Sequence, residues 1–160
     1  MIKVYLSHIR PVLEYGSSVW NMGYLGDLRL LERIQRRWTR CILGLEGASY
    51  LQRLRSLNLF SIQGRLLRAD LILVYKIFHN MCSIQPRDIF HFVTDSRTRC
   101  HKYKICVPIA NIDVRKRFFS VRVIPWWNSL GHDTVEATSI DVFKRLLHRD
   151  LGDALYQYQD

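Results

Sequence analysis

The sequence is poor in glycine, and the glycine-rich motifs of the common nucleotide-binding and hydrolytic enzymes are missing. Glycine accounts for 8 of the 160 residues. Neither G-x-x-x-x-G-K-[ST] nor G-x-G-x-x-G occurs, so the chain lacks the two familiar loops that hold phosphate groups with backbone N–H groups. G-x-S-x-G and H-E-x-x-H are also missing, which excludes the hydrolases and zinc proteases that depend on those motifs.

Carboxylates and thiols are too widely spaced to predict a metal centre. The chain has no Asp-Asp pair, and a two-metal phosphoryl-transfer site needs neighbouring carboxylates. The four cysteines form no C-x-x-C motif, which predicts free thiols in a reducing compartment. The spacings among His79, Cys82, Cys100, His101 and Cys106 differ from those of structural zinc sites. We therefore expect no catalytic residue, no bound metal, no cofactor and no small-molecule substrate.

Long hydrophobic runs are absent as well. The longest run, Leu71–Tyr75, is far shorter than the ~20 residues that a membrane-spanning helix requires. No hydrophobic signal-peptide region follows Met1. These features predict an intracellular protein, nuclear or cytoplasmic, that is not secreted, has no transmembrane segment and has no membrane partner.

The sequence does contain enough apolar residues for one packed domain, and it has a large excess of positive charge. Hydrophobic residues make up 48% of the chain and aromatic residues 12%, so general disorder is not expected. Lysine and arginine number 24 against 14 acidic residues, which gives a formal charge of +10. This charge favours a polyanionic partner, nucleic acid before membrane, and a basic protein without such a partner is the alternative.

The spacing of apolar residues predicts a mainly α fold, a small helical bundle with a short β-hairpin in the C-terminal half. Five segments show helical periodicity: 2–15, 28–42, 50–57, 62–80 and 140–148. Pro11 should interrupt the first of them, because proline lacks the N–H that a helix needs. Residues 1–80 are expected to form a helical region and residues 81–160 a C-terminal extension, together one structural unit.

Local signals mark the ends of these elements. Four polar residues are placed to cap the helices that follow them: Asp27, Ser49, Ser61 and Ser139. Residues 103–107 alternate between apolar and polar side chains, which predicts a strand paired with residues near Val114. The tail after residue 150 is expected to fray.

The predicted helix at 28–42 has its arginines along one face. Spacings of 4, 3, 1 and 3 residues align Arg29, Arg33, Arg36, Arg37 and Arg40, with Glu32 alone among them. The opposite face is predicted to contain Leu28, Leu31, Ile34, Gln35, Trp38, Cys41 and Ile42. Planar guanidinium groups suit phosphate oxygens, and like charges four residues apart repel one another without an anion. We therefore expect contact with phosphate, and a solvated helix face is the alternative.

The C-terminal half contains a second group of basic residues that is also a candidate for contacting phosphate. Its members are Arg97, Arg99, Lys102, Lys104, Arg115, Lys116, Arg117 and Arg122. The four tryptophans are candidates for stacking on bases, but tryptophan on an apolar helical face usually belongs to the core. We expect Trp38 and Trp127 to be core residues.

Five blocks occur in a fixed order along the chain: IRPVLEYGSSVWN, LERIQRRWTRCILGL, RADLILVYKIFHN, RKRFFSVRVIPWWNSL and TSIDVFKRLL. In that order they resemble the C-terminal region of reverse transcriptases of non-LTR retrotransposons of the LINE-like, jockey type. The resemblance extends from about Tyr5 to Leu147. Two positions depart from the family's pattern, since Gly131 stands where proline is usual and Cys100 where glycine is common.

The resemblance implies the thumb and C-terminal extension of an RNA-directed DNA polymerase, in which the arginine-bearing helix grips an RNA/DNA template–primer through its phosphates. It implies that the fingers and palm lie before Met1, and that the catalytic aspartates and Mg belong to that missing palm. This chain would then be a truncated copy that binds nucleic acid and polymerises nothing. The alternatives are a helical protein-interaction module, with exposed apolar surface near Ile2, Leu6 and Ile9, and a relic without function.

Overall fold

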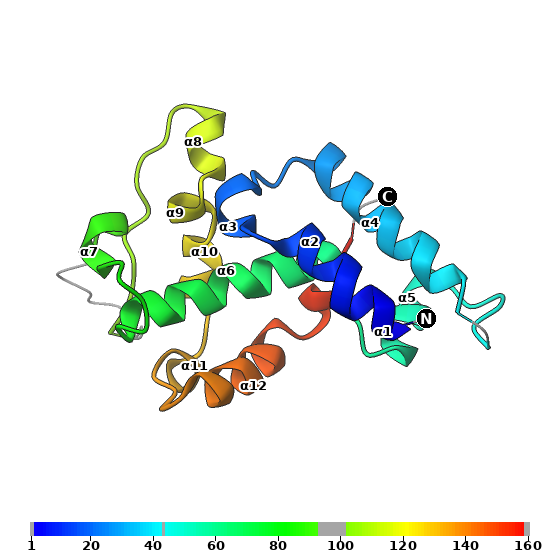
Figure 1. Cartoon of the computed structure of the whole chain (residues 1–160). Coiled ribbons are helices and arrows are strands. Elements are labelled where there is room, and N and C mark those ends of the chain that lie inside the picture. Colours follow the sequence, from blue (N-terminus) through cyan, green and yellow to red (C-terminus); the bar gives the residue numbers. More distant parts are fainter. Residues whose placement is uncertain (1, 43, 93–101, 159–160) are drawn as a thin grey trace. The chain divides into compact units, whose positions relative to one another are not determined.

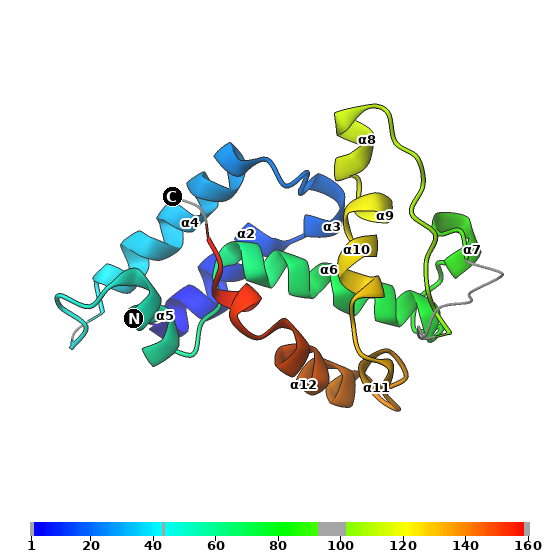
Figure 2. The same ribbon diagram turned by 180° about the vertical axis from the view of Figure 1, so that it is seen from behind.

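The computed structural model describes residues 2–42, 44–92 and 102–158, and it is mainly helical, as predicted (Figure 1, and Figure 2 from behind). The α-helices are α1 (Ile2–Val4), α2 (Arg10–Glu14), α3 (Ser17–Trp20), α4 (Leu25–Arg40), α5 (Tyr50–Ser56), α6 (Ile62–Phe78), α7 (Pro86–Ile89), α8 (Asp113–Arg117), α9 (Phe119–Arg122), α10 (Ile124–Asn128), α11 (His132–Val135) and α12 (Ile140–Leu151). A π-helix, η1, covers Tyr5–Ile9, and a 3-10 helix, η2, covers Gly152–Tyr156. Across the described ranges, every helix is too short or too polar to cross a membrane.

The internal contacts divide the chain into two compact units. Unit 1 comprises Met1–Leu66 together with Asp153–Asp160, and unit 2 comprises Leu67–Gly152. The boundary between them falls inside α6. The expected organisation into residues 1–80 and 81–160 stays a prediction.

Pro11 changes the helix that precedes it. The residues before it, Tyr5–Ile9, form the π-helix η1, in which the Arg10 N–H donates to the Tyr5 carbonyl five residues earlier. Because proline has no N–H and its ring crowds the preceding turn, a wider turn accommodates it. The helical path then continues through α2 and ends at Gly16, whose φ of 64° belongs to the left-handed region.

Three of the four predicted helix caps are confirmed. The side chains of Ser49, Ser61 and Ser139 each accept a hydrogen bond from the backbone N–H three residues later, at 3.3, 3.0 and 3.3 Å. The prediction for Asp27 is wrong, because α4 begins at Leu25 and Asp27 lies in its first turn. An acidic residue there still favours the positive end of the helix dipole.

The core of unit 1 is built around two tyrosines and two leucines: Tyr5, Tyr50, Leu54 and Leu59. Ile2, Leu6 and Ile9 pack against this core. The prediction that these three residues form an exposed apolar surface is therefore wrong. They lie on the same side of the N-terminal helix as Tyr5, so the burial of that tyrosine covers them as well.

The predicted fraying of the tail is also wrong for residues 153–158, which dock on the start of α6. The backbone N–H of Ser61 donates to the Leu155 carbonyl at 3.0 Å, and the Ser61 hydroxyl donates to the Gln157 carbonyl at 2.5 Å. A Cβ atom on Gly64 would lie 2.2 Å from the Leu155 oxygen. Glycine at this position therefore permits the close approach of the tail.

The core of unit 2 is aromatic and is centred on the second half of α6. Phe78 stacks on Trp127 and on Phe90, with ring centroids 5.2 and 6.0 Å apart. Tyr75 stacks on Phe143 at 4.2 Å and donates its hydroxyl to the Ala137 carbonyl at 2.6 Å. These contacts join α6 to α10, to α12 and to the residue that follows α7.

The predicted β-hairpin is wrong for the residues described, in which β pairing is limited to one antiparallel bridge between Phe92 and Ile105. Val114, the expected partner, lies in α8. The backbone N–H of Ile105 donates to Asn128 Oδ1 at 3.0 Å, and its carbonyl accepts from Asn128 Nδ2 at 2.8 Å. The side-chain amide of Asn128 thus bonds both backbone groups of Ile105 that a second strand would have bonded. The alternation of apolar and polar residues indicates which side chains are buried, but it does not identify the hydrogen-bonding partner of the backbone.

Candidate nucleic-acid interface

Helix α4 places four exposed arginines on one side: Arg29, Arg33, Arg37 and Arg40. We call these four residues the arginine row. Because an α-helix rises about 1.5 Å per residue, members four residues apart are separated by about 6 Å along the axis. Within residues 2–42, 44–92 and 102–158, none of the four guanidinium groups forms an ion pair with a carboxylate. The row is therefore accessible to an external anion.

Arg36, the fifth arginine predicted for this face, is held against aromatic rings of unit 1. Its Cζ atom lies 4.8 Å from the centroid of the Tyr50 ring and 4.5 Å from that of Tyr158. The side chain is half-buried. Cation–π contacts of this kind attract a guanidinium group to the faces of the rings, so Arg36 differs in its surroundings from the arginine row.

The fully buried side chains of α4 are polar, and of these the sequence predicted only Gln35 on the inward face. The predicted inward residues Leu28, Leu31, Trp38 and Ile42 are half-buried. Glu32, Gln35 and Thr39 are buried, at 4%, 0% and 1% exposure. Ile34 and Cys41, predicted to face inward, are exposed. Spacings of three and four residues put the buried trio on one face, and these spacings are the signal by which Glu32 could have been found from the sequence.

A hydrogen-bond network holds this polar side in place. The Tyr5 hydroxyl donates to Gln35 Oε1 at 2.6 Å, and Gln35 Nε2 donates to the Tyr50 hydroxyl at 2.9 Å. Tyr50 in turn donates to Glu32 Oε1, and the backbone N–H of Ile62 donates to Glu32 Oε2 at 2.8 Å. The network ties α4 to η1, to α5 and to the first residue of α6.

Burial dominates the electrostatics of this network. It raises the pKa of Glu32, although hydrogen bonds from Tyr50 and from the Ile62 N–H oppose the change. Burial also raises the pKa values of Tyr5 and Tyr50, so both hydroxyls stay protonated and can donate. Because the network fixes which side of α4 is buried, it also fixes the arginine row on the exposed side.

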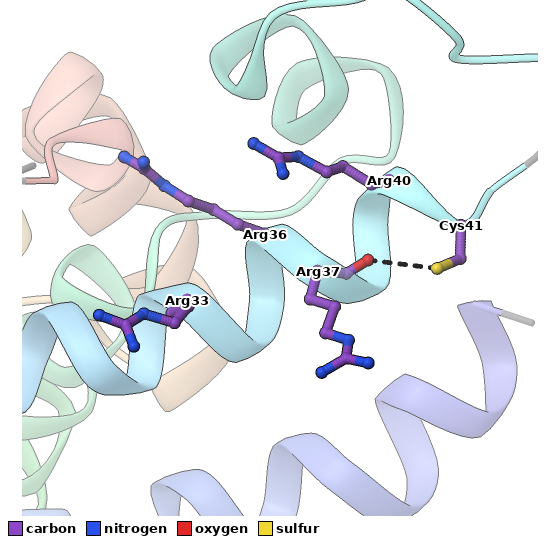
Figure 3. Close-up of a pocket in the computed structure, with 5 residues that line it drawn as sticks. All are labelled: Arg33, Arg36, Arg37, Arg40 and Cys41. Atoms are coloured by element: carbon purple, nitrogen blue, oxygen red, sulfur yellow. Dashed lines mark hydrogen bonds between the residues drawn. The ribbon is translucent and has the colours of Figure 1, made fainter.

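A hollow of about 520 Å³ lies at the C-terminal end of α4. It is lined by Arg33, Arg36, Arg37, Arg40 and Cys41 (Figure 3). The Cys41 thiol donates to the Arg37 carbonyl at 3.4 Å. Figure 3 shows the side chains of Arg36 and Arg40 extending to one side of the helix and that of Arg37 pointing away from them. The guanidinium groups of these lining residues therefore point in different directions and do not converge on one point.

Among the described members of the second predicted basic group, Lys102 lies apart from the basic residues of α8. Lys102 pairs with Glu136 at 3.5 Å, and Glu136 directly follows α11. Arg115, Lys116 and Arg117 lie on α8. Within unit 2, α8 and α11 lie at opposite ends in both views (Figures 1 and 2).

Several residues of the second basic group form ion pairs or ring contacts within the chain. Lys116 pairs with Asp113 at 3.0 Å, and the buried Asp70 carboxylate accepts from Arg122 Nε and Nη2 at 3.1 and 2.9 Å. The Arg115 guanidinium lies 5.6 Å from the Phe118 ring. Lys104 and Arg117 are half-buried, and each interacts with another group of the protein. Arg97 and Arg99 lie outside the described residues.

The four tryptophans differ in burial, and Trp20 and Trp126 are both 40% exposed. The prediction for Trp127 is confirmed, because its side chain is fully buried and its indole N–H donates to the Tyr103 carbonyl at 2.9 Å. Trp38 is half-buried and packs on Tyr5 with ring centroids 6.2 Å apart. Trp20 is 40% exposed, and its indole N–H donates to the Tyr15 carbonyl at 2.7 Å. The arginine row thus has no exposed tryptophan on its own helix.

In the part of the chain that the structure describes, no three His, Cys, Asp or Glu side chains lie close enough to hold a metal ion. Cys100 and His101 fall outside that part. Comparisons of this chain with models of protein families, with characterised proteins and with solved structures give no match. The arginine row is therefore the feature from which we infer function.

Proposed function

We propose that this chain is a thumb-like nucleic-acid-binding region of a non-LTR retrotransposon reverse transcriptase, and that the arginine row contacts the sugar–phosphate backbone. The order of the five sequence blocks supports the parentage. The observation that supports the contact is a row of four exposed guanidinium groups on α4 without acidic partners among the described residues. Contacts of this type position a strand and read little of its sequence.

A purely structural role explains only part of the row. Arg37 and Arg40 lie in the last turn of α4, where positive charge stabilises the negative end of the helix dipole. Arg29 and Arg33 lie in earlier turns, beyond the reach of that effect. Like charges four residues apart destabilise a helix slightly, and an external phosphate chain would remove that repulsion.

The test compares two triple variants that remove the same charge. One replaces Arg29, Arg33 and Arg37 with glutamine. The control replaces Lys3, Arg87 and Arg145 with glutamine. These are exposed cations on α1, α7 and α12, and their replacement also lowers the net charge of +10 by three. Affinity for an RNA/DNA hybrid is measured by fluorescence anisotropy over a range of salt concentrations.

The row variant should reduce the slope of log affinity against log salt by about 2 to 3, since each phosphate contact contributes about 0.7–0.9. The control variant should change the slope much less. Equal slopes for the two variants would show that net charge alone drives binding, and the row would then have no special role.

The proposal assigns catalysis to a palm domain as partner. The sequence has no Asp-Asp pair that could hold catalytic Mg. The chain by itself should therefore extend no primer on an RNA template when dNTPs and Mg are supplied. Incorporation of nucleotides by the purified chain would contradict this assignment.

A protein-interaction module is the second candidate, because unit 1 exposes large apolar side chains on α2, on α3 and in the two-residue connection between them. Val12 is 76% exposed, Tyr15 86% and Val19 82%. Docking through such a surface depends on apolar burial and is much less sensitive to salt than phosphate contact. The salt series described above therefore separates the two functions.

A further inference from the structure

We propose that the hollow on α4 takes up one unpaired base of a single-stranded nucleic acid, while the arginines around it contact the phosphates on either side of that base. This inference rests on the proposed function, since it specifies the kind of strand that the same surface binds. It adds a base-binding subsite to a surface that was otherwise assigned to phosphate alone.

The size and walls of the hollow are the first support. Phosphate contact requires no concave surface, because exposed guanidinium groups on a helix suffice. A volume of about 520 Å³ lies within the range of about 300–1,000 Å³ that is typical of pockets for small organic molecules. The walls are the aliphatic stems of the arginines and the Cys41 thiol, which favour an apolar, flat group over an ion.

The directions of the side chains are the second support. A compact oligophosphate needs several cations that converge on one point, whereas Arg37 points away from Arg36 and Arg40 (Figure 3). A nucleotide in a strand has its base between two separate phosphates, which matches cations spread around a hollow. Planar guanidinium groups also stack on unpaired bases.

Arg36 gives the hollow one preorganised wall. Its contacts with Tyr50 and Tyr158 hold the guanidinium group in one position, so little side-chain freedom is lost when a ligand arrives. A base in a duplex is stacked and paired, and its entry would require unstacking. The hollow therefore favours single strands over duplexes.

The first experiment compares three probes with the unmodified chain by fluorescence anisotropy at one salt concentration. The probes are a short oligothymidylate, an abasic sugar–phosphate strand of the same length, and a duplex of that length. The oligothymidylate should bind at least about five-fold more tightly than the abasic strand, since stacking a base contributes roughly 1–3 kcal/mol. It should also bind more tightly than the duplex.

The second experiment narrows the hollow without changing charge. Cys41→Leu adds aliphatic bulk at an exposed lining position. Gly26→Leu is the matched control, because Gly26 is exposed on the same helix, is not a lining residue, and a Cβ atom there would meet nothing within 4 Å. Cys41→Leu should lower the affinity for oligothymidylate toward that for the abasic strand, and Gly26→Leu should leave the difference unchanged.

The outcomes separate this inference from the proposed function. Equal affinity of the unmodified chain for the oligothymidylate and the abasic strand overturns the base subsite and leaves phosphate contact standing. Tighter binding of the duplex than of the single strand also overturns it. Failure of every probe to bind overturns both proposals.

Discussion

Replacing Glu32 with alanine tests whether the buried polar network holds α4 in place. Glu32 accepts hydrogen bonds from the Tyr50 hydroxyl and from the backbone N–H of Ile62, and its side chain is almost fully buried. The alanine would leave both donors without their acceptor in the interior. We expect a large loss of stability in unit 1.

The magnitude follows from those two donors. Leaving a buried donor unsatisfied costs about 1–3 kcal/mol, so the pair amounts to about 2–6 kcal/mol. The alanine also removes the unfavourable burial of a carboxyl group, which is the cause of the raised pKa of Glu32. The net decrease in the free energy of unfolding should therefore be about 2–4 kcal/mol, a large part of the roughly 5–15 kcal/mol typical of natural domains.

Urea denaturation followed by circular dichroism gives the free energy of unfolding. A double-mutant cycle with Tyr50→Phe then isolates the direct contact, and a coupling energy of about 0.5–3 kcal/mol is expected between the two side chains. Arg145→Ala, on the exposed side of α12, is a suitable control because a surface substitution should change stability by less than about 0.5 kcal/mol. A loss below about 1 kcal/mol for Glu32→Ala, or no coupling to Tyr50, would refute the reasoning.

Three further predictions concern the same packing. The raised pKa of Glu32 means that the folded state binds the carboxyl proton more readily than the unfolded state does. The unmodified chain should therefore lose stability relative to Glu32→Gln as pH rises above 4.5. Urea titrations at several pH values would show this loss. Gly64→Ala should displace the tail, since its Cβ would meet the Leu155 carbonyl, and amide exchange at residues 153–158 should accelerate. Asn128→Ala should lower the thermal midpoint, because both backbone groups of Ile105 lose their partner, at a cost of up to about 1–3 kcal/mol for each group.

Features set by near neighbours in the chain could be predicted from the sequence. The serines at 49, 61 and 139 cap helices because each accepts from an N–H only three residues away. That Arg29, Arg33, Arg37 and Arg40 share one side of α4 follows from helical periodicity alone. Burial of Trp127 was predictable for the same reason, since it lies on an apolar face.

Features that depend on a distant partner could not be predicted in this way. Hydrophobicity assigns Glu32 to the surface and Ile34 to the core, and the structure reverses both assignments because Tyr50 and the start of α6 offer hydrogen bonds to the carboxylate. The hairpin expected at residues 103–107 does not form among the described residues, because Asn128 bonds the backbone of Ile105.

Some features of the candidate site could likewise be predicted from the sequence, and others depend on tertiary packing. By itself the sequence determined the helix, the positive charge and the alignment of the arginines, because these depend on composition and on a repeat of 3.6 residues per turn. Only the tertiary structure decided that Arg36 packs on two tyrosines, that a hollow opens beside it, and that Lys102 and Lys116 pair with carboxylates of the chain. Local periodicity states which side chains share a face, whereas long-range packing decides which of them remain open to a ligand.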